Sequence, residues 1–222
     1  MKTASFENRR DAGRRLARAL MKRGYRGDNI LVLGIPRGGL VVADEVATAL
    51  STALDVVIAR KLRAPYQPEL GIGAVADGDH VLLNEELVRA VSASRDYLNH
   101  EITFQKEEVK RWSRFYRDGR TAPDITGKTV IIVDDGIATG YTFRAALESV
   151  RQRSPDRLVA ATPVAARDSA EMLKAFADEA VCLFIPVSFS AVGAWYRNFA
   201  QVSDEEAASI IRRHWSRWSL AA

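Results

Sequence analysis

Cysteine is nearly absent from this chain. Its 222 residues include one cysteine, Cys182, so an internal disulfide is excluded. Cys182 lies in the apolar run 180–185, where we expect it to pack as a small apolar residue of a buried strand. Histidine is also scarce, and the three histidines lack the spacing of metal ligands. These shortages exclude a disulfide scaffold and a cysteine- or histidine-based metal centre.

Long apolar runs are missing as well. No stretch approaches the roughly 18 apolar residues that are needed to span a bilayer. Five arginines, Arg9, Arg10, Arg14, Arg15 and Arg18, stand where a secretory signal would be apolar. There is no internal repeat and no low-complexity segment. We therefore expect a cytoplasmic protein without a membrane partner.

The overall composition is that of an ordinary globular protein. Hydrophobic residues make up 47% and charged residues 27% of the chain. A length of 222 residues suits one good-sized core, and we expect a single domain over residues 1–222. The net charge of +4 suits a nucleic acid or a highly anionic substrate equally well. Charge alone does not choose between them.

Strand and helix patterns alternate along the first part of the chain. Residues 8–23 form an amphipathic pattern whose arginines are expected on a solvated face. An apolar strand at 29–34, a helix at 40–53 and a strand from 55 to 59 follow. This order predicts a βαβ unit and therefore a parallel sheet.

The middle of the chain differs from this alternation. Residues 71–76 and 80–84 predict a hairpin at the edge of the sheet. Residues 85–116 predict one long helical arm, whose apolar stripe would pack across the domain or against a second subunit. We therefore expect a homodimer. Strands at 129–133, 158–165 and 180–184, with helices at 143–150 and 167–177, complete the expected α/β core.

A dense motif occupies residues 128–142. Residues 129–133 are β-branched, which is typical of a parallel strand covered on both faces. Helical spacing restarts at about residue 143, so the turn between them feeds a helix N-terminus. Such a turn directs backbone N–H groups and the positive end of the helix dipole toward an anion. Gly136 and Gly140 permit the tight turn.

Side chains of the same turn can bind a sugar. Thr139 and Thr142 offer hydroxyl donors to phosphate oxygens. Asp134 and Asp135 can accept hydrogen bonds from vicinal sugar hydroxyls or hold a hydrated cation. The motif thus predicts a sugar-phosphate site. Taken alone, Asp-Asp-Gly also fits an ordinary turn, because Asp and Gly favour turns for local reasons.

The whole string Val-Ile-Ile-Val-Asp-Asp-Gly-Ile-Ala-Thr-Gly-Tyr-Thr at residues 130–142 resembles the phosphoribosyl-pyrophosphate signature of the type I phosphoribosyltransferases. The resemblance covers roughly residues 28–200. It implies an α/β fold with a mainly parallel, twisted sheet flanked by helices. It also implies a helical arm and a small C-terminal hood at about residues 186–222, which the N-terminal segment completes.

Residues 35–39, Ile-Pro-Arg-Gly-Gly, resemble the pyrophosphate loop of this family. The segment ends the first predicted strand, so it can direct N–H groups and the Arg37 guanidinium at a pyrophosphate. In the family this loop contains a non-proline cis peptide, which by position would be the Arg37–Gly38 bond. Pro-Arg-Gly-Gly by itself also fits a simple turn.

Two further expectations concern the next strand and loop. Arg60 and Lys61 would close the strand and bring positive charge to the same crevice, although a solvated basic pair is the commoner case. The resemblance places the Pro-bearing loop 64–73 over the site, with Glu69 facing inward.

The tail carries an aromatic cluster, and two interpretations of it stay open. Its rings either pack the tail onto the core, or Val192, Trp195 and Tyr196 form the wall of an acceptor pocket. Hypoxanthine-guanine enzymes have a comparable Val-Gly pair in the hood. This chain has Ser190 and Arg197 where they have a stacking aromatic and an acidic metal contact, which argues against purine salvage.

The resemblance implies transfer of phosphoribose from phosphoribosyl pyrophosphate (PRPP) to a small nitrogenous acceptor with Mg²⁺ as cofactor, in nucleotide metabolism. The alternative is a non-catalytic regulatory protein that binds PRPP or a nucleotide and is linked to RNA; retention of Arg37 and Lys61 favours the enzyme, and nucleic acid is not the expected partner. The expected catalytic residues are Arg37, Lys61, Asp134 and Asp135, the last two also contacting the metal directly or through water. The residues expected to bind substrate are Arg37, Gly38, Gly39, Arg60, Lys61, Asp134, Asp135, Gly136, Ile137, Ala138, Thr139, Gly140, Tyr141, Thr142, Val192, Trp195 and Tyr196.

Overall fold

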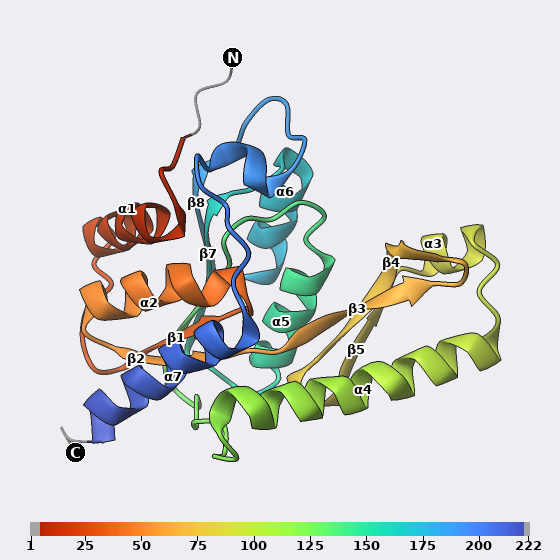
Figure 1. Ribbon diagram of the computed structural model, residues 1–222, viewed down its shortest axis with the longest axis horizontal. Helices are drawn as coiled ribbons and strands as arrows, with labels where there is room; N and C mark the ends of the chain where they lie inside the picture. The colour runs from red at the N-terminus through yellow and green to blue at the C-terminus, as the bar shows by residue number, and fades with distance from the viewer. Residues whose placement is uncertain (1–4, 220–222) are drawn as a thin grey trace.

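A five-stranded parallel sheet forms the centre of the molecule, whose computed structural model describes residues 5–219 (Figure 1). The strand order is β2-β1-β6-β7-β8, and all four pairings are parallel. The strands are β1 (Ile30–Gly34), β2 (Ala53–Val56), β6 (Thr129–Val133), β7 (Arg157–Val164) and β8 (Glu179–Phe184). The predicted parallel sheet is thus confirmed.

Helices cover both faces of this sheet. In β6, Ile131 and Val133 face one core cluster, while Val130 and Ile132 face the other, as the two-residue period of a strand requires. Burial on both faces explains why the strand is apolar throughout. One face carries α1 (Arg9–Lys22), α2 (Gly38–Leu50) and α7 (Asp204–Ser219), and the opposite face carries α5 (Tyr141–Arg151) and α6 (Arg167–Phe176).

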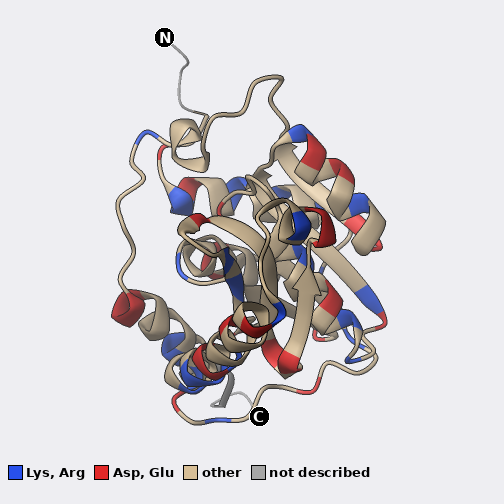
Figure 2. Ribbon diagram, turned by 90° about the vertical axis from the view of Figure 1, so that its right-hand side faces the viewer, with Lys and Arg blue, Asp and Glu red and all other residues tan. Residues whose placement is uncertain are grey.

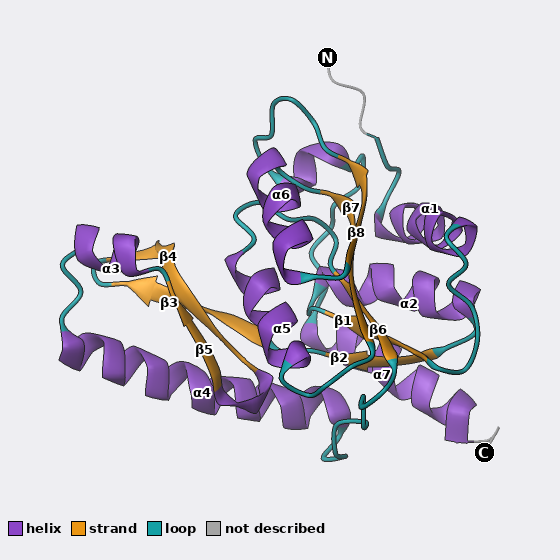
Figure 3. Cartoon of the chain, turned by 180° about the vertical axis from the view of Figure 1, so that it is seen from behind, coloured by secondary structure: helices purple, strands orange, loops and turns teal. Residues whose placement is uncertain are grey.

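A second sheet of three antiparallel strands extends away from this core (Figure 3). Its order is β3-β4-β5, and a short 3-10 turn, η1, joins β4 to β5. The long helix α4 runs along this sheet and then contacts α7 of the main core. The bounds are β3 (Ala59–Ala64), β4 (Gln67–Ala76), η1 (Asp77–Asp79), β5 (His80–Leu83), α3 (Glu85–Ala90) and α4 (Arg95–Arg117). Neither α4 nor another helix of the described residues is long and apolar enough to cross a membrane.

The hairpin and arm differ from the sequence-based expectation. The predicted hairpin belongs to the separate sheet and not to the edge of the main one. The single helix predicted over 85–116 is wrong, because the chain breaks between α3 and α4. Ser92 has a left-handed backbone (φ 52°), and the Ser94 hydroxyl accepts a hydrogen bond from the Tyr97 N–H at 3.2 Å. Serine at such a cap starts a new helix.

Two further boundaries are also corrected. β2 ends at Val56, and the next residues cross to the second sheet, so the predicted strand 55–59 is wrong. α2 begins at Gly38 and ends at Leu50, before the predicted end at 53, because Ser51 adopts a left-handed conformation (φ 53°). The tail helix α7 was not among the predicted elements.

A buried ion pair joins the two sheets. Arg117, at the end of α4, donates to the Asp55 carboxylate of β2 at 2.9 Å and lies 3.4 Å from Asp77 of η1. The Arg117 and Asp55 side chains are 4% and 1% exposed. Removing one partner of such a pair leaves an uncompensated buried charge, so this contact ties the arm to the core.

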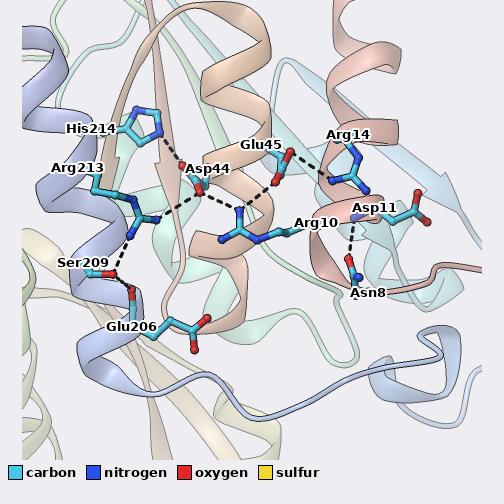
Figure 4. A network of polar contacts seen from close by, with 10 residues as sticks. All are labelled: Asn8, Arg10, Asp11, Arg14, Asp44, Glu45, Glu206, Ser209, Arg213 and His214. Atoms are coloured by element: carbon cyan, nitrogen blue, oxygen red, sulfur yellow. Dashed lines mark hydrogen bonds and ion pairs between the residues drawn. The ribbon is translucent and has the colours of Figure 1, made fainter.

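A polar network fastens the helices on one face of the sheet (Figure 4). Asp44 of α2 lies 2.8 Å from His214 Nε2 of α7 and 3.3 Å from Arg10 Nη1 of α1. Arg213 Nη2 lies 3.8 Å from the same carboxylate. Burial raises the pKa of Asp44, but the hydrogen bonds and charges of His214 and Arg10 outweigh it and lower this pKa overall.

Replacing Asp44→Asn should therefore destabilise the fold in a pH-dependent way. A carboxylate with a depressed folded pKa stabilises the protein above its ordinary pKa of 3.8, and this contribution is lost as the pH falls through the folded value. At about pH 7 the loss should be roughly 1.5–3 kcal/mol, as for hydrogen bonds to a charged group. Urea unfolding across the pH range measures it. A constant difference down to about pH 2, or an equal loss in the exposed control Asp156→Asn, would contradict the assignment.

Candidate active site

The ends of two central strands bring the predicted motifs together. β1 pairs with β6 so that Gly34 lies opposite Val133, the last residue of each strand. The loop after β1 and the turn after β6 therefore leave the same edge of the sheet. Ligands of open α/β sheets bind at this carboxyl edge.

Two glycines let the loops touch. A Cβ on Gly38 would lie 1.9 Å from Asp135 Oδ2, and one on Gly39 would lie 2.8 Å from Asp134 Oδ1. Both distances are far below van der Waals contact, so a side chain at either position would displace an aspartate. The Gly-Gly pair thus places the loop after β1 directly on the acidic pair after β6.

The loop after β1 contains a non-proline cis peptide bond between Pro36 and Arg37. The predicted position, Arg37–Gly38, is wrong by one residue. Arg37 already has helical angles (φ −94°, ψ −49°), and α2 begins at Gly38, so the Arg37–Gly38 bond belongs to the start of the helix.

The helices that follow β1, β6 and β7 at this edge have no side-chain cap. Asn8, Asn84 and Ser94 cap α1, α3 and α4 through their side chains, whereas α2, α5 and α6 lack such a hydrogen bond within the described residues. The first N–H groups of an α-helix have no partner inside the helix. The starts of α2 and α5, which flank the acidic pair, are therefore available to anions, and the dipole of each helix favours negative charge there.

Neighbouring elements hold the turn before α5 in place. Ile137 is buried and donates its N–H to the Val164 carbonyl at 2.9 Å. The Ser169 hydroxyl of α6 donates to the Ala138 carbonyl at 2.6 Å. Ala138 and Thr139 themselves are exposed. The turn is thus anchored from behind, and its exposed side faces solvent at the helix start.

The acidic pair is unusual electrostatically. Burial, and then the adjacent Asp135 charge, raise the pKa of Asp134 well above its ordinary range. Burial also raises the pKa of Asp135, against the opposing charge of Arg9. A cation or a hydroxyl donor beside the pair would favour the charged form of both groups.

The carboxylates of Asp134 and Asp135 can bind a metal ion only together with other ligands. Within the described residues no group of three or more His, Cys, Asp or Glu could hold an ion. Mg²⁺ is commonly bound through one or two carboxylates, with substrate phosphates and water completing the shell. Asp134 and Asp135 fit such a shared site and not a site built from protein alone.

Arg9 is a site residue that the sequence analysis missed. It was assigned to the solvated face of the first helix, yet its side chain is only 11% exposed. Its Nε donates to Asp135 Oδ2 at 2.6 Å, and its Nη1 donates to the Ala200 carbonyl at 2.7 Å. The guanidinium also stacks 3.7 Å from the centroid of the Phe199 ring. No local pattern separates this arginine from its exposed neighbours.

Asp135, one member of the acidic pair, lines a cavity of about 540 Å³. Its lining consists of Arg9, Pro36, Arg37, Gly38, Asp135, Val192, Phe199, Gln201 and Val202. Segments from the chain's start, its centre and its tail thus meet at one site, and the tail with the N-terminal segment covers the cavity as a hood would.

The three predicted hood residues separate in space. Val192 lines the cavity, whereas Trp195 and Tyr196 are 8% and 5% exposed and lie in a core cluster. The Tyr196 ring packs 5.4 Å from Phe6 and 4.9 Å from Phe199. Its hydroxyl donates to the Asp135 carbonyl. The structure thus favours the packing interpretation for these two rings, with Tyr196 supporting the acidic pair from behind.

The predicted basic pair also separates. Arg60 and Lys61 lie inside β3 of the second sheet, so the prediction that they close a strand of the main sheet is wrong. Arg60 lines a second cavity of about 300 Å³ together with Arg37, Trp112, Tyr116 and Asp204. The remaining lining residues of that cavity are Pro36, Ile58 and Ala59.

Lys61 points elsewhere. Its Nζ donates to the Glu69 carbonyl at 2.7 Å, and the Glu69 carboxylate is fully exposed. The expectation that Glu69 faces the site is therefore wrong. Neither residue lines the two cavities beside Arg37.

Ser190 and Arg197, which the sequence analysis set against the hood residues of hypoxanthine-guanine enzymes, do not line the cavity. Arg197 is exposed and pairs with Glu7 at 3.1 Å. Ser190 is exposed as well.

The chain is similar in sequence and structure to proteins of one known family. The family model described as the phosphoribosyl transferase domain matches residues 4–190. A crystal structure of TT1426 from Thermus thermophilus is 43% identical, with a TM-score of 0.79, and the match covers 94% of this chain and 98% of that one. Two Mycobacterium tuberculosis proteins, MT0597 and Rv0571c, whose names assign them provisionally as phosphoribosyl transferases, are 41% identical over 208 residues.

The match to the two mycobacterial proteins covers 94% of this chain but only 46% of theirs, so the chain spans about half the length of these curated relatives. The family model nevertheless covers the sheet, the loop after β1 and the acidic motif. The fold is that of the type I phosphoribosyltransferases, and the chain belongs to the phosphoribosyl transferase domain family.

Proposed function

We propose that this protein transfers phosphoribose from PRPP to a nitrogenous acceptor and releases pyrophosphate, with Mg²⁺ as cofactor. The observation that carries the proposal is the meeting of two uncapped helix starts, α2 and α5, on either side of the Asp134–Asp135 pair. PRPP has anionic groups at both ends of its sugar, so it needs two anion sites with sugar-binding groups between them.

The reaction replaces one bond at C1 of the ribose. The lone pair of the acceptor nitrogen forms the new N–C1 bond, and the C1–O bond breaks with its electrons leaving on pyrophosphate. The acceptor's N–H proton, where it has one, is released to water. Little covalent work falls to the protein, so its contribution is positioning and electrostatic stabilisation.

Each part of the crevice has a proposed task. The backbone N–H groups of residues 138–142 and the hydroxyls of Thr139 and Thr142 bind the 5-phosphate. Asp134 and Asp135 accept hydrogen bonds from the ribose hydroxyls and help to hold Mg²⁺, which when bound offsets the charge of the departing pyrophosphate. Arg37, with the N–H groups of Gly38 and Gly39, binds the pyrophosphate. Lys61 is left without a contact there.

The rival function, a regulatory protein that binds a nucleotide or RNA, has less support. In the view of Figure 2, acidic and basic residues are interspersed along the helices and do not separate into a basic face. Nucleic-acid binding usually requires clustered basic residues. A sensor of nucleoside monophosphates would also have no use for Arg37 and the second uncapped helix.

Arg37→Ala tests the division of labour between the two anion sites. The Arg37 side chain is 43% exposed and makes one ion pair, with Asp204 at 3.7 Å, so the fold should tolerate its loss. PRPP affinity should fall by roughly 1.5–3 kcal/mol, as for a lost charged contact. Ribose 5-phosphate affinity should not change. Calorimetry with both ligands and Mg²⁺, beside a pyrophosphate-release assay on the wild type, measures this; equal losses for both ligands would refute it.

We also propose a homodimer. Much of the apolar stripe on which this expectation rests is covered within the chain, because Leu98, Ile102 and Trp112 pack against the main core. Phe104 of α4, however, is 50% exposed, and Tyr66 at the tip of the β3–β4 hairpin is fully exposed. Sedimentation at micromolar concentration should give about twice the 24.5 kDa chain mass. Phe104→Ser should lower the measured mass toward that of a single chain. A monomeric wild type would contradict the proposal.

A further inference from the structure

The Arg9 guanidinium is a fixed positive charge at the wall of the cavity. Two of its nitrogens hold the Asp135 carboxylate and the Ala200 carbonyl, and its plane rests on Phe199. A Cβ on Gly38 would lie 2.6 Å from Arg9 Nε, so the guanidinium also lies against the loop after β1. Arg9 thus stands between the hood and the place of the reacting sugar.

The charges that line this cavity do not balance once the sugar is bound. The charged residues of the lining are Arg9, Arg37 and Asp135. In the proposed reaction Asp135 accepts hydrogen bonds from the ribose hydroxyls and helps to hold the metal, and Arg37 binds the pyrophosphate. Arg9 would then lose its carboxylate partner while its side chain remains almost buried. An unpaired buried charge is strongly unfavourable, so a new anion should replace Asp135.

We propose that this anion is a carboxylate of the acceptor, which would be a planar ring that carries a carboxylate beside its nitrogen nucleophile. The inference rests on the proposed function and specifies its substrate class. The carboxylate takes the place of Asp135 beside the Arg9 guanidinium, which can donate two parallel N–H···O bonds to it. The ring packs against Val192 and Val202, which line the same cavity. Acceptor binding thereby releases Asp135 for the sugar.

Pyrophosphate is the competing anion for Arg9. The geometry favours the acceptor, because the stacking on Phe199 and the bond to Ala200 hold the guanidinium on the hood side. The pyrophosphate already has Arg37 and the uncapped start of α2. A neutral base would leave Arg9 buried beside the ring without a counter-charge, which also argues against purines as acceptors.

The test compares acids with uncharged amides of the same shape. Protein preloaded with Mg²⁺ and ribose 5-phosphate is titrated calorimetrically with orotate against orotamide, and with anthranilate against 2-aminobenzamide. At least one acid should bind about tenfold to a hundredfold more tightly than its neutral partner, the factor expected from a hydrogen bond to a charged group. Arg9→Gln should remove that preference, and Arg9→Lys should retain part of it.

Arg14→Gln is the matched control, because Arg14 lies on the same helix, is half exposed and makes only a 3.7 Å ion pair with Glu45. It should keep the preference for the acid. The inference is overturned if no acid is preferred by the wild type, if Arg9→Gln leaves the preference unchanged, or if it weakens PRPP and not the acid. Failure of the wild type to bind PRPP with Mg²⁺ would instead refute the proposed function, so the two failures are distinguishable.

Discussion

Replacing both carboxylates of the acidic pair, Asp134→Asn with Asp135→Asn, is expected to reduce PRPP affinity by a hundredfold or more. Each carboxylate would lose charged hydrogen bonds to the ribose hydroxyls or to the metal, at roughly 1.5–3 kcal/mol for each contact. Burial raises the pKa of both groups, and the Asp135 charge raises that of Asp134 further, so the charged pair is already disfavoured in the free protein. The variant should therefore fold, and calorimetry with Mg²⁺ and PRPP measures the loss.

Two controls separate binding from folding in this experiment. The amide oxygen that replaces the Asp135 carboxylate can still accept a hydrogen bond from Arg9, but the guanidinium loses its counter-charge, so the melting temperature should fall. Affinity is therefore measured at a temperature at which the variant is folded, and the loss of PRPP affinity should exceed what the loss of stability explains. Asp168→Asn, at an exposed position in the first turn of α6, should leave both quantities unchanged. Wild-type affinity in the double variant would refute the assignment of the sugar site.

The part of the site that could be predicted is encoded locally. Residues 129–142 contain a strand, a turn and a helix start in one uninterrupted segment, and each has its own signal in the sequence. The loop after β1 has the same form. Both motifs follow strands of one parallel sheet, so the βαβ order predicts that both lie at its carboxyl edge. Their contact depends also on the pairing of β1 with β6, which the order of elements along the chain does not specify.

Arg9 could not be found in this way. Its contact with Asp135 spans 126 residues, and the amphipathic pattern of its helix gives the same assignment to Arg9 and to its exposed neighbours. Only the docking of the tail across α1, through Phe199 and Ala200, buries the side chain. Non-local contacts of this kind leave no trace in the residue spacing.

The separation of Arg60 from Lys61 was, in contrast, within reach of the sequence. Successive residues of a strand point to opposite faces, so both side chains could not enter one crevice from inside a strand. Arg60 faces α4, where its Nε donates to Gln105 at 2.9 Å, while Lys61 faces Glu69. The sequence analysis placed the pair at the end of a strand, where side chains need not alternate between the two faces, so it did not detect that the two side chains point in opposite directions.

Replacing Gly38→Ala is expected to abolish PRPP binding while leaving the fold largely intact. The added methyl group would lie 1.9 Å from Asp135 Oδ2 and 2.6 Å from Arg9 Nε, both of them side-chain atoms in the crevice. Gly38 opens α2, where alanine suits the helical backbone. Displacing reacting groups by about 1 Å can cost a hundredfold in activity, so pyrophosphate release should fall by at least that factor.

Two other glycines show whether the effect comes from the crevice. A Cβ on Gly39 would meet backbone atoms, the Asp134 Cα and the Val133 carbonyl, each at 3.0 Å, so Gly39→Ala should lower both the melting temperature and the affinity. Gly119→Ala puts the same methyl group on a strained backbone (φ 74°) with nothing within 4 Å, so it should lower stability and spare binding. Gly38→Ala should show the reverse, a loss of affinity at nearly constant melting temperature. If its affinity fell only in proportion to its stability, the close approach of this glycine to Asp135 would be a packing requirement and not a condition for binding.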